Sequence, residues 1–409
     1  MEATVDLYST ILLLGAAHGL FLALALINAK GGNPTSHRLL ALLTLLFSID
    51  LGLEFLEQSR HITTYLRFAV IDINIDFLFG PLTYLYVCSL TTRECFRFGA
   101  KQWLHFLPFA VGFLLLFPLF KLNSNQLLNL FFQEGGDPRQ ELLWAEAATI
   151  FVGLLSIIQM AIYLVVSIRR LFHHQRLIQD HFSSLERISL TWLRNLLIAL
   201  AALYLFYIAD LFLADMFAFS EQLISYHYLM IVVIIYSMGY LGLRQPAIFS
   251  YRPNEASDKT EPIEPTSYEA IENPDTVQTK KYQRSALDNE TSILLYKELQ
   301  AHMDREKSHL DSKLTLAQLA EQLAISSNYL SQVINEQAGQ NFFDFINSYR
   351  INEAKRSLIN PSPGDTNILS IASNAGFNSK SAFYTAFKRQ TGQTPSQFRK
   401  SSASQSSIS

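Results

Sequence analysis

The stretch GFNSKSAFYTAFKRQTGQTPSQFRK, residues 376–400, carries the strongest local signals in this chain of 409 residues. Gly376 can adopt the positive φ that a tight turn between two helices needs. Asn378 or Ser379 can cap the helix that follows, and Gly392 predicts where that helix ends. A shorter apolar helix is expected just before the turn. The stretch therefore predicts a helix-turn-helix, a motif whose second helix usually enters the major groove of DNA.

The second helix of this motif has two different faces. Phe383 and Phe387 are four residues apart, so they share one face and we expect them in a core. The outward positions are Lys380, Ser381, Tyr384 and Thr385. A closing helix is expected to begin at Thr394, a capping residue followed by proline at the first helical position.

These residues belong to a longer pattern, A-x-x-x-G-F-x-S-x-x-x-F-x-x-x-F-K-x-x-x-G-x-T-P-x-x-[YF]-R. It is met by Ala372, Gly376, Phe377, Ser379, Phe383, Phe387, Lys388, Gly392, Thr394, Pro395, Phe398 and Arg399. In this pattern the chain resembles the AraC/XylS family of transcription regulators. The resemblance implies a DNA-binding domain with two helix-turn-helix motifs, held on one face of the duplex by a linking helix.

The first of the two motifs is expected upstream. Thr315 and Gln318 form a T-x-x-Q capping box at the start of its first helix, and its second helix is expected at 327–337. A longer helix at 342–358 then links the two motifs. Another helix is expected in front of them, at 285–311.

The resemblance also implies which side chains meet DNA. The candidates for base contacts are Asn328, Ser331, Gln332, Lys380, Ser381, Tyr384 and Thr385, since Asn and Gln can pair with adenine and Lys with guanine. The candidates for phosphate contacts are Arg350, Lys355, Lys388, Arg389, Arg399 and Lys400. Residues 314–400 hold eight basic and five acidic residues, a net charge of +3. We therefore expect one copy to bind double-stranded DNA weakly and two copies, as in a homodimer, to bind it usefully.

The residues before 250 have a different composition. Hydrophobic residues make up 49% of the chain, and almost all the excess lies in this half. Seven apolar runs are long enough to span a lipid bilayer, which takes about 20 residues each. They are 8–28, 39–56, 68–90, 103–120, 143–168, 190–216 and 223–243; Asp72 and Asp76 interrupt the third, and Pro108 and Pro118 the fourth.

Basic residues in the loops predict the orientation of these spans. One side holds eleven: Lys30, Arg38, Arg93, Arg97, Lys101, Arg169, Arg170, Arg176, Arg187, Arg244 and Arg252. The other side holds four: Arg60, Arg67, Lys121 and Arg139. We therefore expect a multi-pass protein of the bacterial inner (cytoplasmic) membrane, with the N-terminus outside and the DNA-binding domain in the cytoplasm.

Ionisable residues inside the predicted spans form a second candidate site. They are Asp50, Asp72, Asp76, Asp210 and His227, all expected in the outer half or at the outer edge of the spans. Charges at this depth usually face a bundle interior or a watery cavity. The sequence predicts an outward-opening pocket for a cationic or hydrogen-bonding ligand, or for protons. Solvation of some of these groups at the membrane surface is the alternative, and the sequence does not name the ligand or membrane signal.

Two segments outside the spans have their own features. Residues 251–284 are rich in Pro, Glu, Asp, Ser and Thr, which predicts a disordered linker. The loop 169–190 is long and holds His173, His174 and His181, which lack a regularly spaced acidic or cysteine partner for a metal. We expect a solvated loop and a candidate coupling element that faces the DNA-binding domain. The expected domains are 1–250 (transmembrane sensor), 251–284 (linker), 285–400 (DNA-binding domain) and 401–409 (disordered tail).

The chain as a whole is expected to be all-α, with a seven-helix transmembrane bundle in front of the AraC-type domain. The phrases FLFGPLTYLYVCSLT, LHFLPF, SLTWLRNL and MGYLGLRQPAIF resemble the sensor region of membrane-embedded AraC-type regulators of bacteria. The predicted function is a membrane-tethered one-component transcription regulator. The alternative is a transporter or receptor whose helix-turn-helix domain is regulatory or docks a protein. The sequence has no glycine-rich phosphate loop, nucleophile elbow or H-E-x-x-H, so we expect neither an enzyme nor a bound cofactor or metal.

Overall fold

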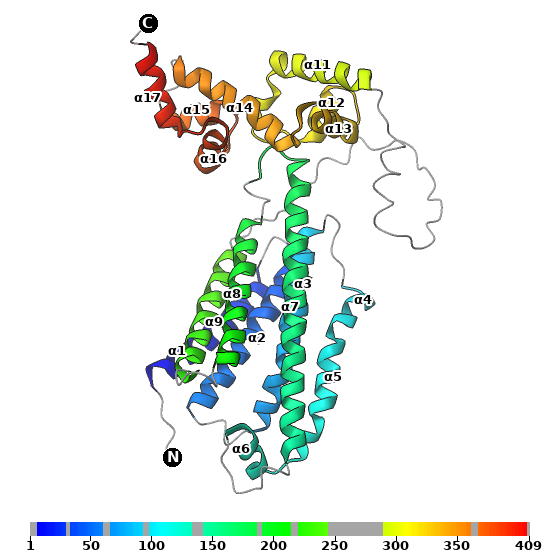
Figure 1. Cartoon of the computed structure of the whole chain (residues 1–409), viewed down its shortest axis with the longest axis vertical. Helices are drawn as coiled ribbons and strands as arrows, with labels where there is room; N and C mark the ends of the chain where they lie inside the picture. Colours follow the sequence, from blue (N-terminus) through cyan, green and yellow to red (C-terminus); the bar gives the residue numbers. More distant parts are fainter. Residues whose placement is uncertain are drawn as a thin grey trace, which may run out of the picture. The chain divides into compact units, whose positions relative to one another are not determined.

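The computed structural model describes residues 6–29, 33–59, 66–92, 98–132, 142–185, 190–213, 220–243, 289–360 and 367–406 (Figure 1). The named elements of these residues are all helices, so the prediction of an all-α protein is confirmed. They form two compact units. The N-terminal unit comprises Met1–His174 and Leu190–Arg252, and the C-terminal unit comprises Gln175–Ser189 and Pro253–Ser409.

Long apolar helices build the N-terminal unit. They are α1 (Leu7–Ile27), α2 (Pro34–Gln58), α3 (Arg67–Thr91), the broken helix Ala100–Lys121, α7 (Leu143–Gln179), α8 (Thr191–Leu213) and α9 (Ser220–Leu243), with a short α6 (Ser124–Phe132) between them. Six of these are long and apolar enough to cross a membrane, which suggests a multi-pass membrane protein. The seventh predicted run falls on α9, whose described apolar part, Tyr226–Leu241, is shorter. A seventh span therefore stays a prediction.

The fourth span is interrupted where prolines occur. It consists of α4 (Ala100–Trp103), η2 (Leu104–Phe106), α5 (Leu107–Leu116) and η3 (Phe117–Lys121). Pro108 and Pro118 lie in the first turns of α5 and η3. Proline has no N–H to donate to the preceding turn, so a new helical segment begins at each of them.

The helices of the N-terminal unit are apolar on their outer as well as their inner faces. Leu12, Leu22 and Leu26 of α1 are buried, yet Leu14 and Phe21 of the same helix are exposed. Large exposed apolar side chains continue over the other spans, as at Leu114, Ile158 and Leu205. A helix that is hydrophobic all round belongs in lipid or in the core of a large protein, and these outer faces have the composition that lipid contact requires.

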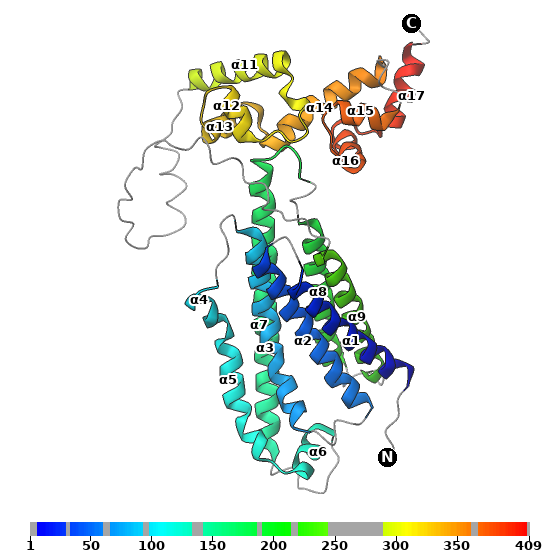
Figure 2. The same ribbon diagram turned by 180° about the vertical axis from the view of Figure 1, so that it is seen from behind.

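Glycine allows α1 and α9 to approach closely. Figure 2 shows α1 lying across α2 and beside α9. A Cβ atom added at Gly239 of α9 would lie 2.0 Å from a methyl carbon of Leu22 on α1. Small residues at such crossings let helix backbones pack directly against each other in a membrane.

The C-terminal unit has two lobes joined by one helix (Figures 1 and 2). The first lobe holds α11 (Asn289–Glu306), η5 (Ser308–Leu310), α12 (Leu316–Gln322) and α13 (Ser327–Ala338). The second holds α15 (Ile368–Asn374), α16 (Lys380–Thr391) and α17 (Pro395–Ser406). The linking helix α14 (Phe342–Ile359) contributes Phe342, Phe345 and Ile346 to the first core and Ile351, Ala354 and Leu358 to the second.

Several boundaries differ from those that the sequence predicts. The segment Gln175–Ser189, which the sequence places with the membrane half, belongs to the C-terminal unit. Helix α17 continues to Ser406, well into the tail 401–409 that is expected to be disordered, because that tail holds no glycine or proline to end the helix. Helix α11 ends earlier than expected, at Glu306, where Lys307 takes a left-handed φ of 50°. The predicted linker 251–284 lies outside the described residues.

Candidate nucleic-acid interface

The first helix-turn-helix is formed by α12 and α13. The predicted capping box at its start is present: the Gln318 backbone N–H donates to the Thr315 hydroxyl (3.2 Å), and the Thr315 N–H donates to the Gln318 side-chain oxygen (2.8 Å). The turn between the helices passes through Ala324, whose φ is 55°. Ser326 then caps α13 by accepting from the Tyr329 N–H (3.3 Å).

Helix α13 buries one face and presents the other. Leu330 and Ile334 are fully buried in the first core. Asn328 is exposed, and Ser331 and Gln332 are half-buried on the outer face. The Gln332 amide donates to the Glu336 carboxylate (2.8 Å). This bond uses one of the two N–H donors of the amide.

The second helix-turn-helix depends on Gly376. Its φ is +90°, and a Cβ atom there would lie 2.6 Å from the His309 carbonyl oxygen and 2.9 Å from that of Leu310. A side chain is therefore excluded both by the backbone conformation and by the closeness of two carbonyl groups. The sequence leaves the cap of the next helix open between two residues, and the structure assigns it to Ser379, which accepts from the Ala382 N–H (3.2 Å).

Helix α16 has the two faces that its sequence predicts. Phe383 and Phe387 are completely buried in the second core. On the outer face, Lys380, Ser381 and Thr385 are exposed and Tyr384 is half-buried. The Lys380 ammonium lies 5.5 Å from the centre of the Tyr384 ring, within the range of a cation–π interaction.

Most of the phosphate candidates are accessible. Lys388, Arg389 and Arg399 are exposed and Lys355 is half-buried. Arg389 forms an ion pair with Asp344 of α14. Because this pair is largely solvent-exposed, its contribution to stability is small, on the order of 0–1 kcal/mol, and the guanidinium can exchange to a phosphate.

Arg350 is the exception, and its predicted role as a phosphate contact is wrong. The side chain is only 1% exposed. Its guanidinium donates to the carbonyl oxygens of His309 (2.8 Å), Asp311 (2.8 Å) and Ser183 (2.8 Å), and to the Ser183 hydroxyl (3.0 Å). Burial lowers the pKa of Arg350 to about 10, so the group stays protonated at neutral pH. The charged group donates hydrogen bonds to carbonyl and hydroxyl oxygens inside the C-terminal unit.

His309 lies in the same interior. The pKa of its imidazole is lowered to about 4, chiefly by burial; the nearby Glu353 carboxylate opposes this shift and the Arg350 cation adds to it. Its Nδ1 atom is buried without a hydrogen-bond partner among the described residues. The neutral form of His309 is therefore the one that the folded unit accommodates.

The predicted membrane pocket residues come partly together in the N-terminal unit. Asp50 of α2 and Asp72 and Asp76 of α3 all lie within electrostatic range of Tyr228 on α9. The His227 ring is 5.3 Å from that of Tyr207 on α8. The side chain of Asp210 lies outside the described residues. Among the residues that the structure covers, no three His, Cys, Asp or Glu side chains form a group that could hold a metal ion.

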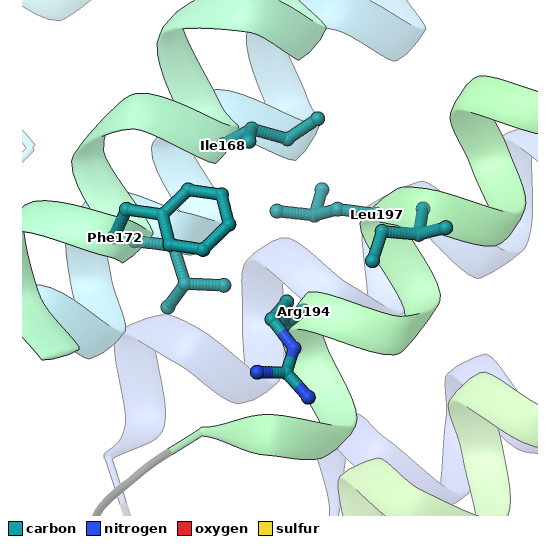
Figure 3. A pocket seen from close by; sticks show the side chains of 6 residues that line it. Ile168, Phe172, Arg194 and Leu197 are labelled. Carbon is teal, nitrogen blue, oxygen red and sulfur yellow. The ribbon is translucent and has the colours of Figure 1, made fainter.

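A small apolar groove lies elsewhere in the N-terminal unit. It is lined by Ile168, Leu171, Phe172, Arg194, Leu197 and Ile198, from α7 and α8 (Figure 3). Arg170 of α7 donates to the hydroxyls of Thr91 and Thr92 (2.9 and 3.0 Å), which places this end of α7 at the C-terminal end of α3. The carboxylates of α3 are near its other end, so the groove does not coincide with the predicted pocket.

Comparison with known proteins identifies the C-terminal part. Residues 319–401 match the family model described as a helix-turn-helix domain. The C-terminal unit carries an AraC-type helix-turn-helix domain. Over 91 residues the chain is 37% identical to an uncharacterized HTH-type transcriptional regulator of Staphylococcus aureus (strain COL). These aligned residues make up 22% of this chain and 12% of that protein.

Two further similarities concern the same AraC-type domain. The melibiose operon regulatory protein of Escherichia coli (strain K12) is 35% identical over 90 residues, which cover 22% of this chain and 29% of that protein. The C-terminal domain of the two-component response regulator yesN from Fusobacterium nucleatum is 32% identical, with 26% of this chain and 97% of that chain covered and a TM-score of 0.22. The chain therefore matches well under two thirds of the curated relatives' length.

Proposed function

We propose that the protein is a membrane-tethered one-component transcription regulator, in which a signal sensed in the membrane region controls sequence-specific DNA binding. The observation that carries this proposal is the union, in one chain, of six candidate membrane spans and an AraC-type domain with two capped recognition helices. The relatives that match this part of the chain are named as an HTH-type transcriptional regulator and as an operon regulatory protein.

The two recognition helices supply the proposed DNA contacts. Asn328, Ser331 and Gln332 of α13 and Lys380, Ser381, Tyr384 and Thr385 of α16 contact base edges. Lys355, Lys388, Arg389 and Arg399 contact phosphates. Because α14 is one continuous helix between the two motifs, both recognition helices can bind the same duplex. A second copy on an adjacent site raises the affinity of the complex.

The membrane region is proposed to hold the sensor. The N-terminus lies outside the cytoplasmic membrane and the DNA-binding domain in the cytoplasm, as the basic loop residues predict. Asp50, Asp72 and Asp76 then bind a cation, a hydrogen-bonding ligand or protons. In cells with the Asp72→Asn, Asp76→Asn double variant, the occupancy of the bound sites and the transcripts of the neighbouring genes no longer change with growth conditions, although the protein still recognises the same sites.

Genome-wide crosslinking and sequencing of DNA bound to the full-length protein tests the proposal. The wild-type protein gives a few sharp sites, and the Asn328→Ala, Lys380→Ala double variant loses them. Lys297→Ala, which removes an exposed lysine from α11, is the matched control and retains them. If wild-type protein enriches no site, or if the double variant retains every site, the domain serves as a regulatory or protein-docking module instead.

A further inference from the structure

A short segment of the sequence between α7 and α8 pairs with the start of the first helix-turn-helix. We call His181–Ser184 the docking segment; it lies within the C-terminal unit. Phe182 forms an antiparallel bridge with Thr315. The Leu316 N–H donates to the His181 carbonyl oxygen (3.0 Å), and the Ser183 N–H donates to the Leu314 carbonyl oxygen (3.3 Å). The docking segment thus adds a backbone pairing next to the capping box of α12.

Within the docking segment, Ser183 is the residue that contacts the middle of α14. Its side chain is buried, and its hydroxyl donates to the Leu314 carbonyl oxygen (2.6 Å). The same hydroxyl and the Ser183 carbonyl oxygen accept two hydrogen bonds from the Arg350 guanidinium. Arg350 lies between Ile346, in the first core, and Ile351, in the second. The docking segment therefore contacts the point where the two lobes join.

Ser184 reaches the second helix-turn-helix. Its hydroxyl accepts a hydrogen bond from the Asn378 amide (2.9 Å), which also donates to the Ser312 carbonyl oxygen (3.1 Å). Asn378 directly precedes Ser379, the cap of the recognition helix α16. Four residues thus contact the first motif, the linking helix and the turn that begins the second recognition helix.

The docking segment contributes no residue to either apolar core, and Arg350 also donates to the carbonyl oxygens of His309 and Asp311, which lie outside the segment. We therefore expect both lobes to stay folded when the docking segment leaves. Within the described part of the unit, α14 is the one helix that contributes to both cores, so a contact at their junction bears directly on the angle between the lobes.

We propose that the docking segment is the coupling element of the protein. When docked, it fixes the angle between the two recognition helices. Since α7 precedes it and α8 follows it in the chain, a change in these helices alters docking and thereby the spacing of DNA elements that the two motifs can bind together. This coupling rests on the proposed function.

Crosslinking in membranes tests docking without DNA. The full-length chain, with Cys88→Ser and Cys95→Ser, carries Ser184→Cys and Asn378→Cys, whose native side chains touch. A control pair joins Ser184→Cys to Thr291→Cys, exposed on α11. The first pair is expected to form a disulfide at least about tenfold faster than the control pair. Adding Ser183→Pro to the first pair removes the backbone N–H and the hydroxyl that accepts from the Arg350 guanidinium. We expect this change to slow disulfide formation about tenfold, the effect of losing a hydrogen bond to a buried charged group. Equal rates for the two pairs would overturn docking.

DNA binding by the full-length protein in lipid discs tests the coupling. In each probe, the two DNA elements that the two motifs of one chain bind are separated by whole or half helical turns of about 10.5 base pairs. Wild-type protein and Ser348→Ala, a serine substitution on α14 away from the docking segment, are expected to prefer one spacing about tenfold; Ser183→Pro loses this preference and Ser183→Ala weakens it.

The outcomes of the two experiments are distinguishable. If Ser183→Pro slows the crosslink but keeps the spacing preference, the coupling is wrong although docking is real. If wild-type protein binds no DNA element at all, the proposed function fails and the coupling with it, while the crosslinking rates still decide whether the segment docks.

Discussion

At the scale of single residues, the C-terminal unit uses a buried cation as a structural anchor. Arg350 donates to three carbonyl groups from two separate parts of the chain, one at Ser183 and two at His309 and Asp311. An arginine in a DNA-binding domain is usually assumed to face DNA, because guanidinium groups suit phosphates. Here the nearly complete burial of Arg350 decides against that role.

Replacing this anchor should loosen the unit. We expect Arg350→Met, which keeps the length of the side chain, to destabilise the C-terminal unit by about 2–3 kcal/mol, because several buried carbonyl groups lose their donors. Hydrogen exchange of α14 amides in the full-length protein measures the effect. Arg356→Met on the same helix removes only an exposed ion pair with Glu353 and should cost less than about 1 kcal/mol. Equal effects of the two substitutions would contradict the anchoring role.

His309 should make the same unit sensitive to mild acid. Its pKa is lowered to about 4 in the folded state, whereas an unfolded histidine titrates near pH 6.5. Between these values the unfolded state binds a proton that the folded state rejects, so stability is highest above about pH 6.5 and falls as the pH drops toward 4. Hydrogen exchange at pH 7 and pH 5 measures this loss. His309→Gln should remove most of the difference.

At the scale of elements, glycines end or turn the helices for two different reasons. Gly376 and Gly392 both have positive φ, +90° and +74°. An added Cβ meets two carbonyl oxygens at Gly376 and nothing within 4 Å at Gly392. We expect Gly392→Ala to cost about 1–2 kcal/mol from the backbone conformation alone, and Gly376→Ala to cost at least about 1–3 kcal/mol more. Hydrogen-exchange rates of the α15 and α16 amides compare the stabilities of the two variants. Equal losses of stability would mean that the two carbonyl groups beside Gly376 move away from the added methyl group at no further cost.

The local elements of the C-terminal unit could be predicted because their signals are local. The capping box of Thr315 and Gln318 forms within the first turn of α12, and Gly392 ends α16 directly after its last turn. The bridge between Phe182 and Thr315 could not be predicted, since it joins one residue pair far apart in the sequence and leaves no periodic pattern. The burial of Arg350 could not be predicted either, because its hydrogen-bond partners are far from it in the sequence. The outward positions of α13 and α16 followed from helical spacing, but their DNA contacts stay predictions.

At the scale of the whole molecule, the modest charge of the DNA-binding domain should set its response to salt. Each phosphate contact contributes about 0.9 to the slope of log K against log salt concentration. We expect Lys388→Ala to reduce this slope by about one, with similar loss of affinity for every DNA sequence. Lys297→Ala, on α11, should leave the slope unchanged. Titration of full-length protein in lipid discs measures both, and an unchanged slope for Lys388→Ala would remove that residue from the phosphate contacts.

The docking segment also bears on how such a protein can be recombined. A chimera that takes over only residues 253–409 would carry both recognition helices but lack Ser183, and the Leu314 carbonyl and the Arg350 guanidinium would each lose a partner. If docking couples the two units as proposed, an engineered biosensor that exchanges the membrane region keeps its signal only when residues 175–189 are transplanted together with the DNA-binding domain, because this unit consists of two segments that are separate in the sequence.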